Sequence, residues 1–457
     1  MEQFDLQQFV EQVETLLESK NYRELKAILN DEMPQDIALL LEELPDKVMP
    51  PVFRLLTKEN AADVFVEMSS DSQEQLLGIF SDAEVKSVFE EMFLDDVVDV
   101  IEEMPASVVK RIINQADPET RKQINEILQY PKDSAGTIMT VEYVSLKAQW
   151  TVQDCFAHIR KTAVDKESIY TCYVTDEKRK LLGIVTVKDL LLHDYETVVR
   201  DIMEEDAIFC LTTDDKEQVA LTMQKYDLSA LPVVDGENRV VGIITVDDIL
   251  DVFEEEVTED MSKMAAITPS SEAYLERSVW DVWKSRIPWL LLLMISATFT
   301  GIVINTFEST LTPLLFACVP MLMDTGGNAG SQSSVTVIRG LAVNDLEPRD
   351  ALKVVWKEVR VAILLALCLS VACFGKLMLI DGLMLGYAYT WDVSLVVSLA
   401  LFCTVVIAKL VGCLMPMLAK VLHLDPAVVA SPFITTIVDV LSLVIYCQIA
   451  MHVLPAI

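Results

Sequence analysis

The feature that most constrains this chain is the uneven division of its charge and apolar residues at about residue 287. The 457 residues carry a formal net charge of −34. Residues 287–457 hold 8 Lys and Arg against 10 Asp and Glu, a net of −2, so residues 1–286 carry −32. A soluble acidic part followed by an apolar part predicts a multidomain chain. Nucleic acid is excluded as a partner, because its phosphates require Lys and Arg.

The acidity has two interpretations. It keeps a protein soluble, and it supplies oxygen ligands for hard divalent cations such as Mg²⁺. The nine cysteines form no CxxC pair and are expected to be structural. The N-terminus, MEQFDLQQFV, is acidic and does not resemble a signal peptide, so we expect the acidic part to stay in the cytosol.

Residues 1–130 contain short apolar-periodic stretches separated by acidic turns and prolines. Glu-Glu-Leu-Pro at 42–45 and Glu-Glu-Met-Pro at 102–105 suggest a repeat. Short helices in series that cannot each bury an apolar face alone predict a helical solenoid.

Residues 131–246 contain an internal duplication. LLGIVTVKDLL at 181–191 reappears as VVGIITVDDIL at 240–250. LPVVDGENRVVGIITV predicts a hairpin around Asp235-Gly236. The duplication resembles a tandem pair of α+β CBS domains. That resemblance implies possible ATP binding, with Asp189 and Asp248 toward the ribose and Thr186 and Thr245 near the phosphates. Alternatively, the pair only packs and dimerises.

A connecting helix is expected next, because apolar residues recur at helical spacing from Ile249 to Met264 among many acids. It either couples the soluble and apolar parts or is a passive linker. The expected domains are an acidic helical domain at 1–130, tandem CBS domains at 131–246, a connecting (plug) helix at 247–270 and an all-α transmembrane pore domain at 271–457.

Five apolar stretches are long enough to span a membrane: 287–307, 311–338, 361–380, 393–419 and 430–454. Lys and Arg gather in the loops after the second and fourth spans, which marks those loops as cytoplasmic. We therefore expect a multi-pass protein of the inner (plasma) membrane. Its N-terminus would be cytosolic and its C-terminus outside.

Two features within the spans point to chemistry. The run Asp324 to Gln332 has three glycines in five residues, and we expect it to interrupt the second span, as in helices whose free carbonyls line a cavity. The alternative is close helix packing of the GxxxG type. Asp439 is an ionisable residue inside the fifth span and is a functional candidate by default. The alternative is a structural pair with Lys409.

The order of these parts, with PMLMDTGGNAGSQ at 320–332 and PFITTIVD at 432–439, resembles the MgtE family of magnesium channels over the whole chain. The resemblance implies a homodimer with one pore on its two-fold axis. It implies hydrated Mg²⁺ held between paired copies of Asp439, with Gly327 and Thr435 as backbone positions and Asn328 as the pore amide. The role of Asp324 stays open.

Negative feedback by cytosolic Mg²⁺ is the expected regulation. LDDVVDVIEE places Asp95 and Asp99 four residues apart on a helix. Bridging cations would relieve the repulsion between facing carboxylates and close the pore. The resemblance supports a set of sensor ligands: Asp95, Asp99, Asp227, Asp248, Asp251, Glu256, Glu259, Asp260 and Asp425.

The expected function is thus a Mg²⁺-selective channel for magnesium uptake. One alternative is a secondary divalent-cation transporter coupled to H⁺ or Na⁺, and another is a membrane nucleotide sensor without transport. An enzyme is not expected, because the soluble part has only His158 and His193, no Ser/His/Asp grouping and no phosphate-binding Gly loop.

Overall fold

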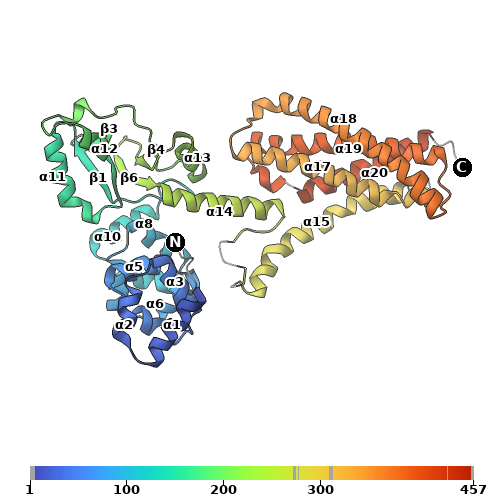
Figure 1. Cartoon of the computed structure of the whole chain (residues 1–457). Helices are drawn as coiled ribbons and strands as arrows, with labels where there is room; N and C mark the ends of the chain where they lie inside the picture. Colours follow the sequence, from blue (N-terminus) through green and yellow to red (C-terminus); the bar gives the residue numbers. More distant parts are fainter. Residues whose placement is uncertain (1–5, 271–273, 276, 308–311, 430, 454–457) are drawn as a thin grey trace. The chain divides into compact units, whose positions relative to one another are not determined.

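The computed structural model describes residues 6–270, 274–275, 277–307, 312–429 and 431–453. The chain forms two compact units, Met1–Phe253 and Glu254–Ile457. The first unit combines helices with two small sheets, and the second is helical (Figure 1). The loop expected at 308–310, between the first two spans, lies outside the described residues.

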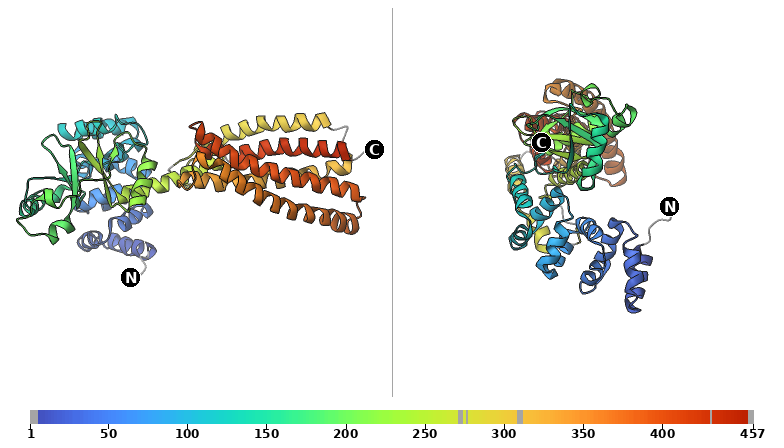
Figure 2. Two further views of the ribbon diagram at one scale, coloured as in Figure 1. Left: turned by 90° about the horizontal axis from the view of Figure 1, so that it is seen from above. Right: turned by 90° about the vertical axis from the view of Figure 1, so that its left-hand side faces the viewer.

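Short helices make up the first part of unit one, as the sequence predicts. They are α1 (Leu6–Glu18), α2 (Tyr22–Leu29), α3 (Pro34–Glu43), α4 (Met49–Phe53), α5 (Lys58–Val66), α6 (Ser70–Ile79), α7 (Asp82–Phe89), α8 (Leu94–Glu103), α9 (Ala106–Gln115) and α10 (Pro118–Ile127). Alternate helices pack on one another, from α1 on α3 to α7 on α9. Figure 2 shows them as a stacked series. This confirms the predicted helical solenoid.

Local sequence signals begin these helices. Ser81 and Glu84 form a reciprocal capping box at the start of α7. Asp117 accepts hydrogen bonds from backbone N–H groups at the start of α10, where Pro118 takes the first helical position. Each helix is too short to be stable alone, so the shared apolar core must hold the stack together.

The duplication folds as two similar three-stranded sheets. The first copy holds β1 (Tyr143–Lys147), α11 (Val152–Thr162), β2 (Ser168–Thr175), β3 (Leu181–Thr186) and α12 (Val187–Leu192). The second holds β4 (Cys210–Leu211), α13 (Lys216–Tyr226), β5 (Ala230–Val234) and β6 (Val240–Thr245). In each, the first strand is parallel to the second, which pairs with the third in the predicted antiparallel hairpin.

The two copies correspond residue by residue through their strand registers. Lys147 pairs with Thr175 in the first sheet, and Leu211 pairs with Val234 in the second. The two hairpin ends meet, because Val240 donates its N–H to the Arg179 carbonyl at 2.9 Å.

One continuous helix, α14 (Val246–Met264), follows β6. Thr245 precedes it, with its N–H and hydroxyl bound to the Asp248 carboxylate. The helix therefore begins directly after β6, in the first unit, and ends in the second unit.

The second unit is built from long helices. They are α15 (Val279–Phe307), α17 (Val319–Ala342), α18 (Ala351–Gly375) with its π-helical extension η4 (Lys376–Met384), α19 (Trp391–Val421) and α20 (Ser431–Val453), with short α16 (Pro313–Phe316) before α17. Helix α19 packs on α17, α18 and α20, and α17 also packs on α20. Figure 2 shows the long helices side by side.

Within the described residues, four helical segments are long and apolar enough to cross a membrane. These are Val279–Phe307, Pro348–Met384, Trp391–Val421 and Pro426–Val453. They correspond to four of the five predicted spans. The remaining predicted span, the second, corresponds to α17, which is 24 residues long but contains Gly, Ser, Asn, Gln and Asp residues that lower its hydropathy.

The expected interruption of the second span is wrong. Helix α17 runs unbroken from Val319 to Ala342, through Asp324 to Gln332. The weakness of glycine in an isolated helix is outweighed here by packing, because Gly326 and Gly330 allow α17 to approach α19 and α20 closely.

Candidate functional site

Polar side chains lie along α17 and α20 where these helices pack together. Asp324 and Asn328, one turn apart on α17, are exposed, and Thr435 and Asp439, one turn apart on α20, are half-buried. A Cβ on Gly327 would lie 3.1 Å from Cγ2 of Thr435, so the helices nearly touch there. Asp324 is close enough to Asp439 for their charges to repel each other. We call these five residues the polar stripe.

The chemistry of the polar stripe suits a cation. Charged and amide groups within an apolar helix bundle are costly unless they face water or protein. The stripe offers carboxylate, amide and hydroxyl oxygens, which are the ligands that Mg²⁺ prefers. Asp324 belongs to this set, since it lies one turn from Asn328.

The glycines beside the stripe act in packing. A Cβ on Gly326 would lie 2.7 Å from Cγ2 of Thr404 and 3.0 Å from Oγ of Ser442. A Cβ on Gly330 would lie 3.1 Å from the Ala408 carbonyl oxygen. The spacing Gly-x-x-x-Gly therefore serves close helix contact, as the packing alternative predicts.

Lys409 does not pair with Asp439, and that structural alternative is wrong. Its Nζ lies 3.0 Å from Oγ of Ser333 and 3.5 Å from Oε2 of Glu358, and it is almost fully buried. Ser333 also donates to Glu358 at 2.6 Å. The positive charge of Lys409 on α19 is thus balanced by Glu358 on α18, and Ser333 on α17 binds both. Asp439 is therefore not needed to neutralise Lys409.

In the first unit, carboxylates from three elements converge. Asp95 and Asp96 begin α8, Asp248 lies in the first turn of α14, and Glu167 precedes β2. Burial and the repulsion from Asp248 raise the pKa of Asp95 to about 9 and that of Asp96 to about 7. Burial and the same neighbour raise the pKa of Glu167 to about 7. We call these four residues the acidic cluster.

Within the described residues, no basic side chain forms an ion pair with the acidic cluster. Oδ1 of Asp95 and Oε2 of Glu167 are buried without a hydrogen-bond partner among the described residues. Such orphaned oxygens are costly unless a proton or a cation satisfies them. The donor set is all oxygen, so it fits a hard cation.

Sequence reasoning missed Glu167 and Asp96. Glu167 stands alone before a strand, so no periodicity or motif marks it, and only the fold brings it to α8. Asp96 directly follows Asp95, so helical periodicity turns its side chain about 100° away and gives no reason to group the two. In the structure Asp95 is buried and Asp96 is half-buried, and both are close to Asp248.

Other predicted sensor residues of unit one lie outside the acidic cluster. Asp99 and Asp251 are exposed. Asp227 ends α13 in the left-handed conformation, with φ of 51°, a conformation in which Asp is enriched among residues other than glycine. Of the predicted α14 ligands, Asp248 lies close enough to Asp95 to raise its pKa by repulsion, after burial.

In the second unit, the end of α14 contacts the loop before α20 through a lysine. Lys263 forms ion pairs with Glu259 and with Asp425, the latter at 2.7 Å. Burial opposes the lysine charge, but its hydrogen bonds to both carboxylates outweigh that effect and raise its pKa. Burial and the nearby Asp425 raise the pKa of Asp260. Glu256, one turn earlier, is half-buried.

The predicted nucleotide residues have structural roles in both copies. Thr186 and Asp189 form a capping box at the start of α12. The Asp248 carboxylate accepts from the Thr245 N–H and hydroxyl at the start of α14. These contacts place each threonine and aspartate at a helix N-terminus, a position that also favours phosphate.

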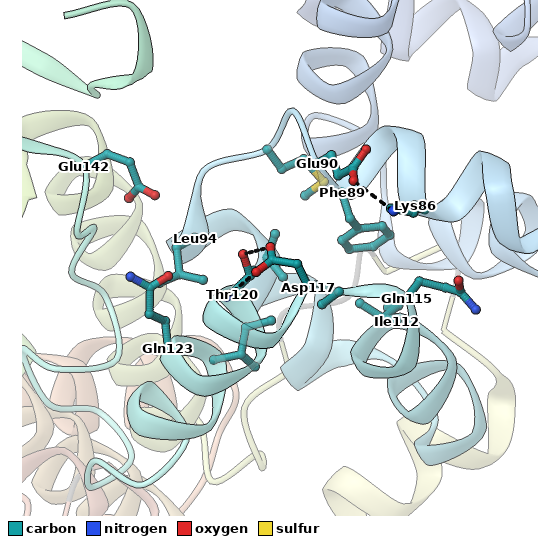
Figure 3. Close-up of a pocket in the computed structure, with 14 residues that line it drawn as sticks. Lys86, Phe89, Glu90, Leu94, Ile112, Gln115, Asp117, Thr120, Gln123 and Glu142 are labelled. Carbon is teal, nitrogen blue, oxygen red and sulfur yellow. Dashed lines mark hydrogen bonds and ion pairs between the residues drawn. The ribbon is translucent and has the colours of Figure 1, made fainter. Parts of the chain in front are cut away.

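The charged side chains that line a cavity of about 190 Å³ among α7 to α10 already have partners. Lys86 pairs with Glu90, Asp117 accepts from the Thr120 hydroxyl at the start of α10, and Glu142 accepts from the Thr140 hydroxyl (Figure 3). No group of three or more His, Cys, Asp or Glu side chains is already arranged around a metal position in the part of the chain that the structure describes. A cation at the acidic cluster would have to draw the carboxylates closer.

Three family descriptions match the chain in order. "MgtE intracellular N domain" matches residues 32–133, "CBS domain" matches 135–196 and 199–255, and "Divalent cation transporter" of the MgtE type matches 319–449.

Whole-length relatives agree. The chain is 37% identical to "Magnesium transporter MgtE" of Thermus thermophilus, over 96% of this chain and 97% of that protein. It is 30% identical to the protein of the same name from Bacillus subtilis, over 95% of each.

Two solved structures each resemble about half of the chain. The cytosolic domain of the Mg²⁺ channel MgtE in complex with ATP is 36% identical with a TM-score of 0.51, and it covers 53% of this chain and 99% of that one. The soluble part of a magnesium transporter is 28% identical, with a TM-score of 0.52 and coverage of 55% and 99%. Together with the polar stripe, these relationships establish that the chain is not an enzyme and belongs to the MgtE family of magnesium transporters.

Proposed function

We propose that this protein is a Mg²⁺-selective channel that mediates magnesium uptake and is closed by cytosolic Mg²⁺. The polar stripe is the observation that carries the permeation half. Its carboxylate, amide and hydroxyl groups lie within helices that are otherwise apolar, and an exposed Asp324 or Asn328 cannot face lipid at acceptable cost.

A homodimer would cover the stripe. In a symmetric dimer the same face meets itself across the two-fold axis, so Asp439 of each copy would approach the other. Mg²⁺ gives up its water reluctantly. Paired carboxylates that hold the hydrated ion through its water shell avoid that cost, and the double negative charge favours divalent over monovalent cations.

The acidic cluster supports the regulatory half. Without a cation, Asp95, Asp96, Glu167 and Asp248 repel one another across the junction between the solenoid and the CBS pair. Cytosolic Mg²⁺ bound there would hold α8 against the start of α14. The ligands proposed beyond the cluster are Asp99, Asp227, Asp251, Glu256, Glu259, Asp260 and Asp425.

The arrangement in the cell follows from the charges of the loops. Lys and Arg after α17 and α19 favour the cytoplasmic side, which puts the N-terminus in the cytosol and the C-terminus outside the inner (plasma) membrane. The proposed domains are 1–130, 131–246, 247–270 and 271–457, with five spans in the last.

ATP is a proposed ligand of the CBS pair at Thr186 and Asp189, or at Thr245 and Asp248. The structurally similar cytosolic domain was solved in complex with ATP. In this chain the hydroxyls and N–H groups sit at helix starts suited to phosphate.

Mg²⁺ uptake into liposomes that contain the purified protein, without H⁺ or Na⁺ gradients, tests the permeation half. Asp439→Ala should abolish the flux, and Asp392→Asn, an exposed carboxylate at the start of α19, should not change it. Flux that survives in Asp439→Ala would disprove the pore assignment. Flux that requires a gradient of H⁺ or Na⁺ would establish the coupled transporter instead.

A further inference from the structure

A second cavity, of about 420 Å³, lies in the first unit between α10 and the first CBS sheet. Lys147 and Arg179 bring positive charge to it, Ser145 and Thr175 bring hydroxyls, and Tyr143 brings an aromatic ring. This combination is unusual in a region that carries a net charge of −32. We call it the basic cavity.

The lysine of the basic cavity is held by neutral acceptors. Nζ of Lys147 donates to Oγ1 of Thr175 at 3.1 Å and to the carbonyl of Asp176 at 2.8 Å. Thr175 is 1% exposed and its Oγ1 lies 2.8 Å from Oγ of Ser145. An ammonium has three protons, so one remains to be donated into the cavity.

Acidic side chains lie near the two cations of the basic cavity. Within the described residues, neither Lys147 nor Arg179 takes part in an ion pair. The Asp176 carboxylate accepts from the N–H groups of Lys178 and Lys180 and also attracts the charge of Lys147. One acid, Glu126, lines the cavity, and it pairs with Lys122 at 3.5 Å. The lining therefore carries two basic side chains against one acid that already has a partner.

The second CBS copy provides an internal comparison. Its registers place Leu211 where the first copy has Lys147, and Val234 where it has Thr175. The left-handed hairpin position taken by Arg179, with φ of 63°, is Asn238 in the second copy, with φ of 65°. The fold therefore requires none of the basic or hydroxyl groups, since the duplicate forms the same sheet without them.

We propose that the basic cavity binds a small anion that bears a phosphate group. Lys147, Arg179 and the hydroxyls would bind the phosphate, and the rings of Tyr130 and Tyr143 would contact an organic part. The volume lies in the range of small-molecule sites. The ligand would join α10 of the solenoid to the first CBS sheet.

This site differs from the one proposed for ATP. Thr186 pairs with Thr171, at one end of the β2–β3 hairpin, whereas Thr175 pairs with Leu181 at the other. Binding at the basic cavity is independent of the proposed channel activity, because it needs no ion flux to be observed.

Calorimetric titration of the full-length protein in detergent, in buffer free of divalent cations, tests the proposal. The probes are inorganic phosphate and phenyl phosphate. Both should bind the wild-type protein, phenyl phosphate more tightly because of the tyrosine rings. Lys147→Met and Arg179→Asn should each weaken binding at least tenfold. Arg179→Asn introduces the residue that the second copy carries at this φ, so the fold is kept.

Two matched controls decide the location. Lys178→Gln removes an exposed charge from the same turn but outside the cavity, and Lys188→Gln removes one beside the Thr186–Asp189 capping box. Both should bind as the wild type does. The proposal is overturned if the wild-type protein binds neither probe at 10-fold molar excess over millimolar protein. It is also overturned if Lys178→Gln weakens binding as much as Arg179→Asn does, or if Lys188→Gln is the only substitution that weakens binding.

Discussion

Nζ of Lys263 lies 2.7 Å from Oδ2 of Asp425, so the last turn of α14 is joined to the loop before α20 by an ion pair within the protein. The same ammonium contacts Glu259. A lysine therefore occupies the place between carboxylates where a divalent cation was expected. This contact does not require Mg²⁺, whereas in the acidic cluster Oδ1 of Asp95 and Oε2 of Glu167 are buried without a hydrogen-bond partner among the described residues.

Lys263→Met should make inhibition by cytosolic Mg²⁺ weaker. Without the lysine, Glu259, Asp260 and Asp425 repel one another, so the end of α14 is held less firmly. The Mg²⁺ concentration for half-inhibition of flux should rise about two- to fivefold, since a partly exposed ion pair contributes up to about 1 kcal/mol. Flux through liposomes measures this. Lys284→Met, in the exposed pair with Asp281, is the control. A lower half-inhibition concentration would show that the freed carboxylates bind Mg²⁺ instead.

Lys409→Met should destabilise the helix bundle strongly. It leaves the carboxylate of Glu358 buried without its cation, which costs about 3–5 kcal/mol in buried pairs. Lys409→Met with Glu358→Gln should recover much of that loss, because no buried charge remains. Thermal unfolding in detergent compares the three proteins. An equal loss of stability in the single and double variants would mean that side-chain packing, and not charge, stabilises the contact between Lys409 and Glu358.

Gly412→Ala should also destabilise the bundle, because a methyl group there would overlap the carbonyl of Gly330 on α17. Overpacking of this kind costs about 1–3 kcal/mol. Gly375→Ala on α18 is the matched control, since a Cβ there meets nothing within 4 Å, and its better helix propensity should leave stability unchanged or slightly higher. The unfolding midpoints of the two variants should therefore move in different directions.

The acidic cluster predicts a pH dependence with a definite sign. The pKa of Asp95 is raised to about 9, and those of Asp96 and Glu167 to about 7, from ordinary values near 4. Between about pH 4 and pH 9 the folded form therefore binds more protons than the unfolded form. The free energy of unfolding falls as pH rises through 7 and then through 9, where these carboxyls lose their protons in the folded form. Hydrogen exchange of α8 amides in the full-length protein, without Mg²⁺, should quicken over this range.

Two comparisons check the origin of that pH effect. Asp95→Asn should flatten the dependence, while Glu91→Gln, an exposed residue just before α8, should leave it unchanged. Added Mg²⁺ should slow the exchange more at pH 9 than at pH 6, because the carboxylates are then ionised. Exchange that is independent of pH in the wild-type protein would exclude a titrating cluster.

The sequence predicted those parts of the fold that repeat or persist over many residues. The division of charge, the solenoid pattern and the duplicated strand–turn–strand motif each involve long segments, so local exceptions do not hide them. The order of domains followed from these patterns, and the resemblance to the family rested on that order together with the motifs at 320–332 and 432–439.

Predictions failed where tertiary packing determines whether a helix continues or which side chains meet. The glycines near Asp324 were expected to break a helix. Intrinsic helix propensity is a weak guide here, because the glycines let neighbouring helices pack closely and that packing stabilises α17. Lys409 and Asp439 were considered as partners because both are isolated charges. However, hydropathy does not give the rotation of one helix about its axis relative to another. Glu167 carries no local signal, and its role arises only from the fold.

The contact between Gly330 and Gly412 also limits how the bundle can move. A backbone carbonyl set into the gap left by a missing side chain prevents α17 and α19 from sliding along each other. These two helices must therefore shift as a single rigid body. Any widening around Asp439 has to come from α20 moving away from that body, or from two such bodies separating.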